Sequence, residues 1–146
     1  MLSTVFDTTI LVSGFLTPYG LANQLLSQAR QGAFVLSLSE RIIAETQAVL
    51  LERKHIRKRH PYTDEQAIRF YHALRSSFPC ITHLPPLSGV VRDPNDDHVI
   101  ACALAASASY LVTRDPDLLT LGNYQQVQMI RPEEFIALVR SQDPNP

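Results

Sequence analysis

The sequence predicts a single α/β domain in which a mainly parallel β-sheet lies between two layers of helices. The chain has 146 residues, which is close to the usual size of one domain. Short apolar, β-prone segments alternate along it with longer segments of helical periodicity, and this alternation is typical of parallel sheets. We expect a three-layer α/β/α sandwich of roughly five strands over residues 1–140, followed by a frayed tail over residues 141–146.

Two strand–helix units are predicted in the first third of the chain. Residues 2–6 are apolar and β-prone and end at Asp7, and a loop then leads to a helical stripe over residues 21–29. The sequence FVLS at residues 34–37 predicts a second strand. Ser39 follows it and can cap the next helix.

A third helix and a third strand follow. Thr63 and Gln66 have the spacing of a capping box, and the apolar stripe after them continues until Pro79. Residues 81–84 are β-prone. A loop rich in proline and glycine leads from there to the next helical segment.

The last third of the chain repeats the alternation. A helix is expected from the DPNDD segment to about residue 107, and the apolar sequence YLVT at residues 110–113 predicts a buried strand. Residues 127–130 predict the last strand. Pro132 suits the first position of a final helix, whose first turn carries Glu133 and Glu134.

Composition excludes several classes of protein. Apolar residues make up 45% of the chain and charged residues 18%, as in ordinary globular proteins and unlike disordered or collagenous chains. The N-terminus lacks a positive segment, and no apolar run is long enough to span a bilayer, so we expect a cytoplasmic protein. Cys80 and Cys102 lack metal-ligand spacing and are expected to be free thiols.

Four acidic residues stand at positions that favour chemistry. Asp7 and Asp115 follow strands, and the carboxyl ends of parallel strands are where such sheets bind ligands. Each could also be an ordinary turn or helix-capping aspartate. Glu45 lies three residues after Ile42 and four before Val49, on the stripe that faces the core, although its carboxylate could reach water at the edge of that stripe.

The fourth acid is Asp97, in the segment RDPNDDHVIACALA. Asp93 with Pro94 can start the helix, and Asp96 favours the positive end of its dipole. Asp97 precedes Ile100 by three residues and shares the buried face of the helix. We therefore expect Asp97, not Asp93 or Asp96, to turn inward.

These four carboxylates would repel one another if the sheet brings them together. A divalent cation relieves that repulsion, and hard oxygen ligands suit Mg²⁺ or Mn²⁺, which usually meet substrate phosphate. The residues alone therefore indicate a metal-assisted phosphodiesterase.

The motifs also resemble those of the PIN-domain nucleases, in particular the branch of toxins from bacterial and archaeal toxin–antitoxin pairs. The likeness covers nearly the whole chain in the expected order. It is carried by VFDTTILVSGFL, SERIIAETQAVL, DPNDDHVIACALAASASYLVTRDPDLL and IRPEEF.

The resemblance implies an endoribonuclease that hydrolyses single-stranded RNA with one or two Mg²⁺ or Mn²⁺ ions. By motif position, Asp7, Asp97 and Asp115 are implied as metal ligands, and Glu45 as a direct or water-mediated ligand or as the residue that orients the attacking water. Thr113 and Asp117 match accessory positions. The family also implies a small antitoxin partner and a homodimer.

One position departs from the family pattern. Family members usually carry asparagine two residues after the first aspartate, where this chain has Thr9. A threonine hydroxyl can still form hydrogen bonds, but it is shorter than the asparagine amide. Thr9 therefore predicts reduced activity or an altered metal site, with an unchanged fold.

A basic segment follows the helix that carries Glu45. Its cations are either a solvated helix end or a rim that contacts RNA phosphate, in which case binding would weaken as salt rises. Arg114, beside Asp115, is a further candidate for RNA contact. The candidates in the segment are Arg53, Lys54, Arg57, Lys58 and Arg59.

Other functions fit the sequence less well. The chain has neither GxGxxG nor GxxxxGK, so dinucleotide and P-loop sites lack their phosphate-binding loop. The five histidines have no zinc-binding spacing, and His98 is expected to be solvated or to cap a helix. The main alternative is a catalytically silent PIN-fold protein that binds protein or RNA, with Thr9 as a sign of a relaxed site.

Overall fold

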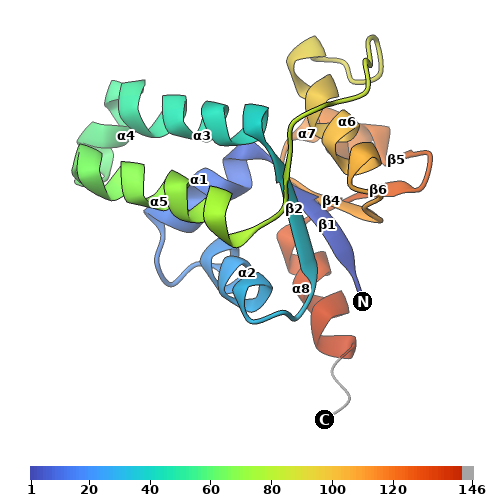
Figure 1. Ribbon diagram of the computed structural model, residues 1–146, viewed down its shortest axis with the longest axis horizontal. Coiled ribbons are helices and arrows are strands. Elements are labelled where there is room, and N and C mark those ends of the chain that lie inside the picture. The colour runs from blue at the N-terminus through green and yellow to red at the C-terminus, as the bar shows by residue number, and fades with distance from the viewer. Residues whose placement is uncertain (143–146) are drawn as a thin grey trace.

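The computed structural model describes residues 1–142 and forms one six-stranded sheet with the strand order β3-β2-β1-β4-β6-β5 (Figure 1). All neighbouring strands are parallel except β5 and β6. The mainly parallel sheet is thus confirmed. The strands are β1 (Ser3–Phe6), β2 (Val35–Ser39), β3 (Cys80–Ile81), β4 (Tyr110–Val112), β5 (Asn123–Tyr124) and β6 (Val127–Ile130).

The sheet has one strand more than the sequence predicts. The additional strand, β5, has two residues and pairs antiparallel with β6 through a tight turn that includes Gln125 at a positive φ of 52°. Two residues are too few to show alternation, so periodicity cannot detect such a strand. β3 is also shorter than residues 81–84 and is confined to Cys80–Ile81.

Eight α-helices lie within residues 1–142, and five of them correspond to helices that the sequence predicts. These five are α2 (Leu21–Arg30), α3 (Glu40–Glu52), α5 (Asp64–Ser77), α6 (Asp97–Ala105) and α8 (Pro132–Ser141). Ser39 caps α3 by accepting a hydrogen bond from the Ile42 amide, and Thr63 with Gln66 forms the predicted capping box of α5. The tail predicted over residues 141–146 lies outside the described residues apart from its first two, and Ser141 still belongs to α8.

Three short helices are missing from the prediction: α1 (Thr8–Leu16), α4 (Lys54–Arg59) and α7 (Pro116–Leu121). The segment of α1 was predicted as a loop. Its buried residues include Ile10, Leu11, Val12 and Gly14, which are spread around the helix, so it shows little amphipathic periodicity. Asp7 starts this helix by accepting a hydrogen bond from the Ile10 amide.

Helices cover both faces of the sheet, as the sandwich prediction requires (Figure 1). α6 contacts β1, β2, β4 and β6 on one face, while α2 packs against α8 on the opposite face. α3 packs against α1 and α5 at the side of the sheet near β2. The core is apolar and centres on Phe6, Phe34 and Phe135, whose rings contact one another.

The order of the strands reverses at β1, and this reversal positions the acidic residues. From β1 the chain passes to β2 and β3 on one side and then returns to place β4 on the other side of β1. Phe6 of β1 is paired with Val112 of β4, so Asp7 and Thr113 follow at the same edge of the sheet. Parallel sheets bind their ligands at such a point.

Among the described residues, no helix combines the length and the apolar character needed to cross a bilayer. Cys80 and Cys102 are both free thiols, as expected. Cys102 is buried in α6 and Cys80 lies at the edge strand β3.

Candidate metal centre and active site

Three aspartates form a compact carboxylate cluster at the carboxyl end of β4. One ligand oxygen from each of Asp96, Asp115 and Asp117 lies within 4.8 Å of the others. Asp115 caps α7 and accepts a hydrogen bond of 2.9 Å from the amide of Asp117, which brings these two carboxylates to one helix end. Asp96 joins them from the 3₁₀ turn η1 (Pro94–Asp96), which precedes α6. We call these three residues the aspartate cluster.

Asp7 is joined to the aspartate cluster through Thr113. The hydroxyl of Thr113 donates a hydrogen bond to the carboxylate of Asp7 and accepts one of 2.9 Å from the amide of Asp115. Asp7 also caps α1 and is only 5% exposed. The predicted accessory position Thr113 is therefore a fully buried link between two of the predicted acids.

The electrostatics of this region indicate an excess of negative charge, although the exposed guanidinium of Arg92 lies 3.9 Å from Oδ1 of Asp117. Burial, opposed by hydrogen bonds from Thr113 and Ile10, raises the pKa of Asp7 to about 6 from the usual 3.8. Burial and the neighbouring carboxylate of Asp115 raise the pKa of Asp96 to about 7. A cation at this position would offset both shifts, because it favours the ionised carboxylates.

The donor set fits a hard divalent cation. It offers carboxylate oxygens only, and Oδ2 of Asp96 is buried without a hydrogen-bond partner in the described part of the chain. Mg²⁺ and Mn²⁺ prefer oxygen ligands of this type. The aspartate cluster, with Asp7 beside it, is therefore the candidate metal centre.

The structure differs from the sequence prediction at Asp97. This residue is buried, as expected, but its Oδ1 accepts a 2.7 Å hydrogen bond from the amide of Val91. Asp97 is not a member of the aspartate cluster found within residues 1–142, whereas Asp96 is. The carboxylate of Asp97 thus holds the loop that precedes α6, and the carboxylate of Asp96 lies with Asp115 and Asp117.

The reason lies in the local geometry before α6. The α-helix begins at Asp97, and the residues before it form a 3₁₀ turn capped by Asp93. A 3₁₀ turn has about 3.0 residues per turn rather than 3.6, so the α-helical period does not give the direction of Asp96. The structure thus places Asp96 beside Asp115 and Asp117, whereas the sequence predicts for it a role at the helix start.

Glu45 of α3 is half-buried and has three partners. Its Oε2 accepts a 3.0 Å hydrogen bond from the hydroxyl of Thr8, and its Oε1 lies 2.8 Å from Nε2 of His98 and 3.7 Å from Nε of Arg41. Burial acts to raise the pKa of Glu45, but the contacts with His98 and Thr8 outweigh it and lower that pKa. Glu45 therefore stays ionised without belonging to the aspartate cluster.

His98 is a site residue that the sequence reasoning missed. It was expected to be solvated or to cap a helix, yet it is only 6% exposed and contacts Glu45 from α6. Its position beside Asp97 was the only signal in the sequence. Thr8, a second partner of Glu45, was missed because the sequence predicts a loop for the segment of α1.

A groove of about 620 Å³ lies between Glu45 and Asp96, which is one member of the aspartate cluster. Both acids line it, together with apolar side chains of α1 and α3. Its other polar lining residues include Glu52, Arg53, Asp93 and Asn95. Thr9 also lines this groove, and its side chain makes no hydrogen bond with a carboxylate among residues 1–142. The groove has room for an extended polymer, with one of its backbone groups between Glu45 and Asp96.

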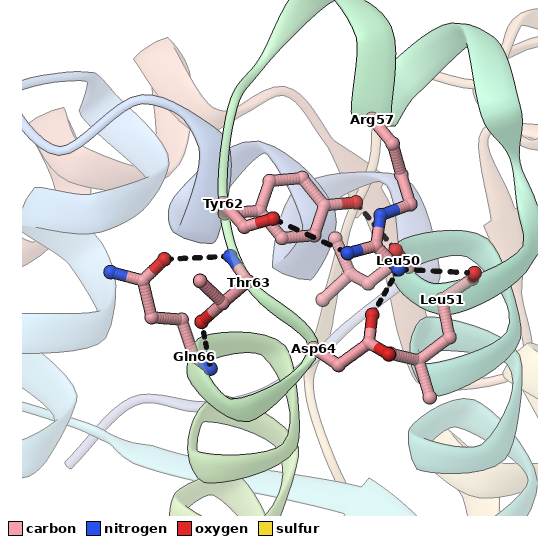
Figure 2. A network of polar contacts seen from close by, with 7 residues as sticks. All are labelled: Leu50, Leu51, Arg57, Tyr62, Thr63, Asp64 and Gln66. Atoms are coloured by element: carbon pink, nitrogen blue, oxygen red, sulfur yellow. Dashed lines mark hydrogen bonds and ion pairs between the residues drawn. The ribbon is translucent and has the colours of Figure 1, made fainter.

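The basic segment divides into two kinds of residue. Arg53, Lys54, Lys58 and Arg59 are exposed, and Arg53 lines the groove. Arg57 instead lies in a network that joins α3, α4 and α5 (Figure 2). Its guanidinium contacts the carboxylate of Asp64 and the carbonyls of Leu51 and Tyr62, and it lies 5.2 Å from the centroid of the Tyr62 ring.

The predicted RNA contacts at Arg57 and Arg114 are thus not free cations. Arg114 forms a two-point ion pair with Glu133 of α8, although both side chains remain about half exposed. A guanidinium engaged in this way is less available to phosphate than an unpaired one. The remaining candidates for phosphate contact lie at the end of α3 and on α4.

Replacing Arg57 by alanine is expected to lower the free energy of unfolding by about 2 kcal/mol, because charge-assisted hydrogen bonds to Asp64 and to two backbone carbonyls are lost. Urea denaturation followed by circular dichroism measures the change. Lys58→Ala is the matched control on the same helix and should stay within about 0.5 kcal/mol of wild type. Equal stability of the two variants would contradict the structural role of Arg57.

Comparison with known proteins is consistent with this geometry. The sequence model of one family, described as PIN domain, matches residues 3–117. No curated protein matches the chain. Among solved structures, VapBC2 from Rickettsia felis, bound to a DNA fragment from its promoter, is similar at 15% identity with a TM-score of 0.61. The match covers 89% of this chain and 98% of that chain.

A second solved structure, PAE2754 from Pyrobaculum aerophilum, is similar at 18% identity with a TM-score of 0.67, and the match covers 97% of both chains. At these identities the likeness to the two structures is one of fold. It extends over nearly the whole length of this chain.

Proposed function

Since this chain belongs to the PIN-domain family, whose sequence model matches residues 3–117, we propose that it is a divalent-metal-dependent endoribonuclease that cleaves single-stranded RNA. The observation that carries the proposal is the meeting of Asp7 with the aspartate cluster at the point where strand order reverses. Phosphodiester hydrolysis needs compensation of negative charge beside the phosphate, and such carboxylates supply it through a cation.

The residues that would hold the cation are Asp96, Asp115 and Asp117, with Asp7 beside them. When bound, Mg²⁺ or Mn²⁺ polarises a phosphoryl oxygen and makes water more acidic. The backbone fixes the ligands in advance, because Asp7 and Asp115 each cap a helix and share the hydroxyl of Thr113. Glu45 keeps a charged carboxylate at the groove, where it can orient water and accept its proton.

The groove and the basic residues support a nucleic-acid substrate. A chain of phosphates along the groove would pass from the aspartate cluster toward Arg53 and the exposed cations of α4. Such contacts make binding fall as salt rises. We propose single-stranded RNA, because the apolar lining from α1 and α3 can accept an unstacked base.

A place in a toxin–antitoxin pair is also proposed, with this chain as the toxin. It is supported by the fold likeness to VapBC2 from Rickettsia felis and by the likeness of its motifs to that branch of the family. A small antitoxin protein, a homodimeric state and a cytoplasmic location belong to the same proposal.

The second candidate function is a PIN-fold binding module without catalysis. Thr9 favours it, because the side chain faces the groove and does not support a carboxylate among the described residues. A module of this kind would bind RNA or protein through the groove without consuming it.

Cleavage of a labelled, mixed-sequence single-stranded RNA by purified protein distinguishes the two functions. We expect cutting with Mg²⁺ or Mn²⁺, none with EDTA, and none by Asp115→Asn with either metal. RNA binding without cutting by a folded wild-type protein would favour the binding module. Restoring asparagine at position 9 by Thr9→Asn would then show whether that position silences the site.

A further inference from the structure

His98 carries out no step in the proposed reaction, yet it makes a close polar contact at the groove. The histidine lies on α6 next to Asp97, and its imidazole is almost fully buried. Its Nε2 lies 2.8 Å from Oε1 of Glu45, and the other oxygen of that carboxylate accepts from the hydroxyl of Thr8. Residues of α6 and α1 therefore contact one carboxylate, each at a different oxygen.

We propose that His98 is a positioning residue that holds the carboxylate of Glu45 in a single orientation at the groove. This inference rests on the proposed nuclease function, in which Glu45 acts on water. A glutamate has three side-chain torsions and loses considerable rotamer freedom when it is held. Arg41 is the other contact at Oε1, but it is 3.7 Å away and 55% exposed, so it contributes little to that restraint.

The buried position makes His98 suited to this role. Since an ionised carboxylate only accepts hydrogen bonds, Nε2 carries the hydrogen in this contact. The packing around α6 holds the imidazole in place before any substrate arrives, whereas an exposed donor would have to be ordered first.

Packing alone gives no reason for a histidine at this position. Its Nδ1 is buried and has no hydrogen-bond partner among residues 1–142, and a buried polar atom without a partner is unfavourable. An apolar side chain of similar size would fill the same space without that cost. The contact with Glu45 is what distinguishes histidine from such a residue.

Matched substitutions test the proposal. His98→Gln keeps an N–H donor near the position of Nε2, and His98→Met has similar length without a donor. We expect His98→Met to lower kcat by about ten- to a hundredfold with little change in KM, and His98→Gln to recover most of the loss. If His98→Met does not fold, His98→Asn replaces it, because the shorter amide reaches only the position of Nδ1.

A double-mutant cycle separates positioning from general damage. In a chain that already carries Glu45→Gln, His98→Met should lower kcat by less than about threefold, because the carboxylate that His98 orients is absent. If His98→Met lowers kcat by the same factor with and without Glu45→Gln, the two residues act independently and the proposal is overturned. An unchanged kcat in His98→Met would also overturn it.

Crystal structures of the His98→Met and His98→Gln variants provide a readout without catalysis. We expect the carboxylate of Glu45 to leave its position in His98→Met and to keep it in His98→Gln. An unmoved carboxylate in His98→Met overturns the proposal. If wild type does not cleave RNA, the proposed function fails, and these two structures still decide whether His98 positions Glu45.

Discussion

Asp96→Asn is expected to lower metal-dependent RNA cleavage at least about a hundredfold, whereas Asp97→Asn is expected to retain it within about threefold. Asp96 belongs to the aspartate cluster and makes no cap hydrogen bond, so its loss affects the metal centre and leaves the helix start intact. Asp97 accepts a hydrogen bond from Val91, and an asparagine oxygen can accept it equally. The two adjacent residues thus form a matched pair.

Initial rates of cleavage with a range of Mn²⁺ concentrations measure this difference. Asp96→Asn should also lose the rise in melting temperature that Mn²⁺ causes in wild type, because the ligand that binds the cation is gone. Asp97→Asn should keep that rise. Loss of activity in Asp97→Asn, with full activity in Asp96→Asn, would restore the assignment that the sequence predicts.

Asp7→Asn is expected to stabilise the metal-free protein above neutral pH and to abolish its cleavage of RNA. Asp7 is buried, and its pKa is raised from 3.8 to about 6. Burying the ionised carboxylate of Asp7 costs free energy of folding. This cost is absent when the pH is below the pKa of Asp7 in the unfolded chain, and it grows as the pH rises to the pKa of Asp7 in the folded protein. Above that point it amounts to about 3 kcal/mol, which is the upper limit of the gain from asparagine.

Asparagine keeps the structural role of Asp7. Its side-chain oxygen can still cap α1 by accepting from the Ile10 amide, and its amide can donate to the hydroxyl of Thr113. The carboxylate charge that the metal centre needs is absent in the variant.

Urea denaturation in EDTA tests this prediction at about pH 4.5 and about pH 8. The variant should exceed wild type clearly at the higher pH and only slightly at the lower pH. Added Mn²⁺ should stabilise wild type more than the variant, because only wild type offers the full set of carboxylates. A variant less stable than wild type at the higher pH without metal would contradict the uncompensated charge of Asp7.

The long, periodic elements of the fold could be predicted from the sequence. α2, α3, α5 and α8 carry clear apolar stripes or capping residues, and α6 is a continuous apolar segment that begins with acidic residues. Four of the five predicted strands correspond closely to observed ones. The missed helices α1, α4 and α7 are short or show little amphipathic periodicity, so the sequence pattern does not predict them. The sixth strand is too short to show any pattern.

The candidate site was predictable in part. Asp7 and Asp115 were found because each follows a strand, where parallel sheets bind ligands, and Glu45 because it lies on an apolar stripe that faces the core. Asp96 and His98 could not be found in this way. The direction of Asp96 depends on a turn with a different period, and the contact of His98 is with Glu45, which is 53 residues away in the sequence.

The sequence by itself determined the architecture of this protein and the type of chemistry it can perform. Apolar periodicity and capping residues involve only residues that are close in the sequence. The position of a carboxylate directly after a strand can likewise be read from the sequence. Only the tertiary structure decided which carboxylates meet. Adjacent aspartates differ in direction according to the backbone of a single turn, and the packing of α6 against the sheet decides that Asp96 faces Asp115 while Asp97 faces the amide of Val91.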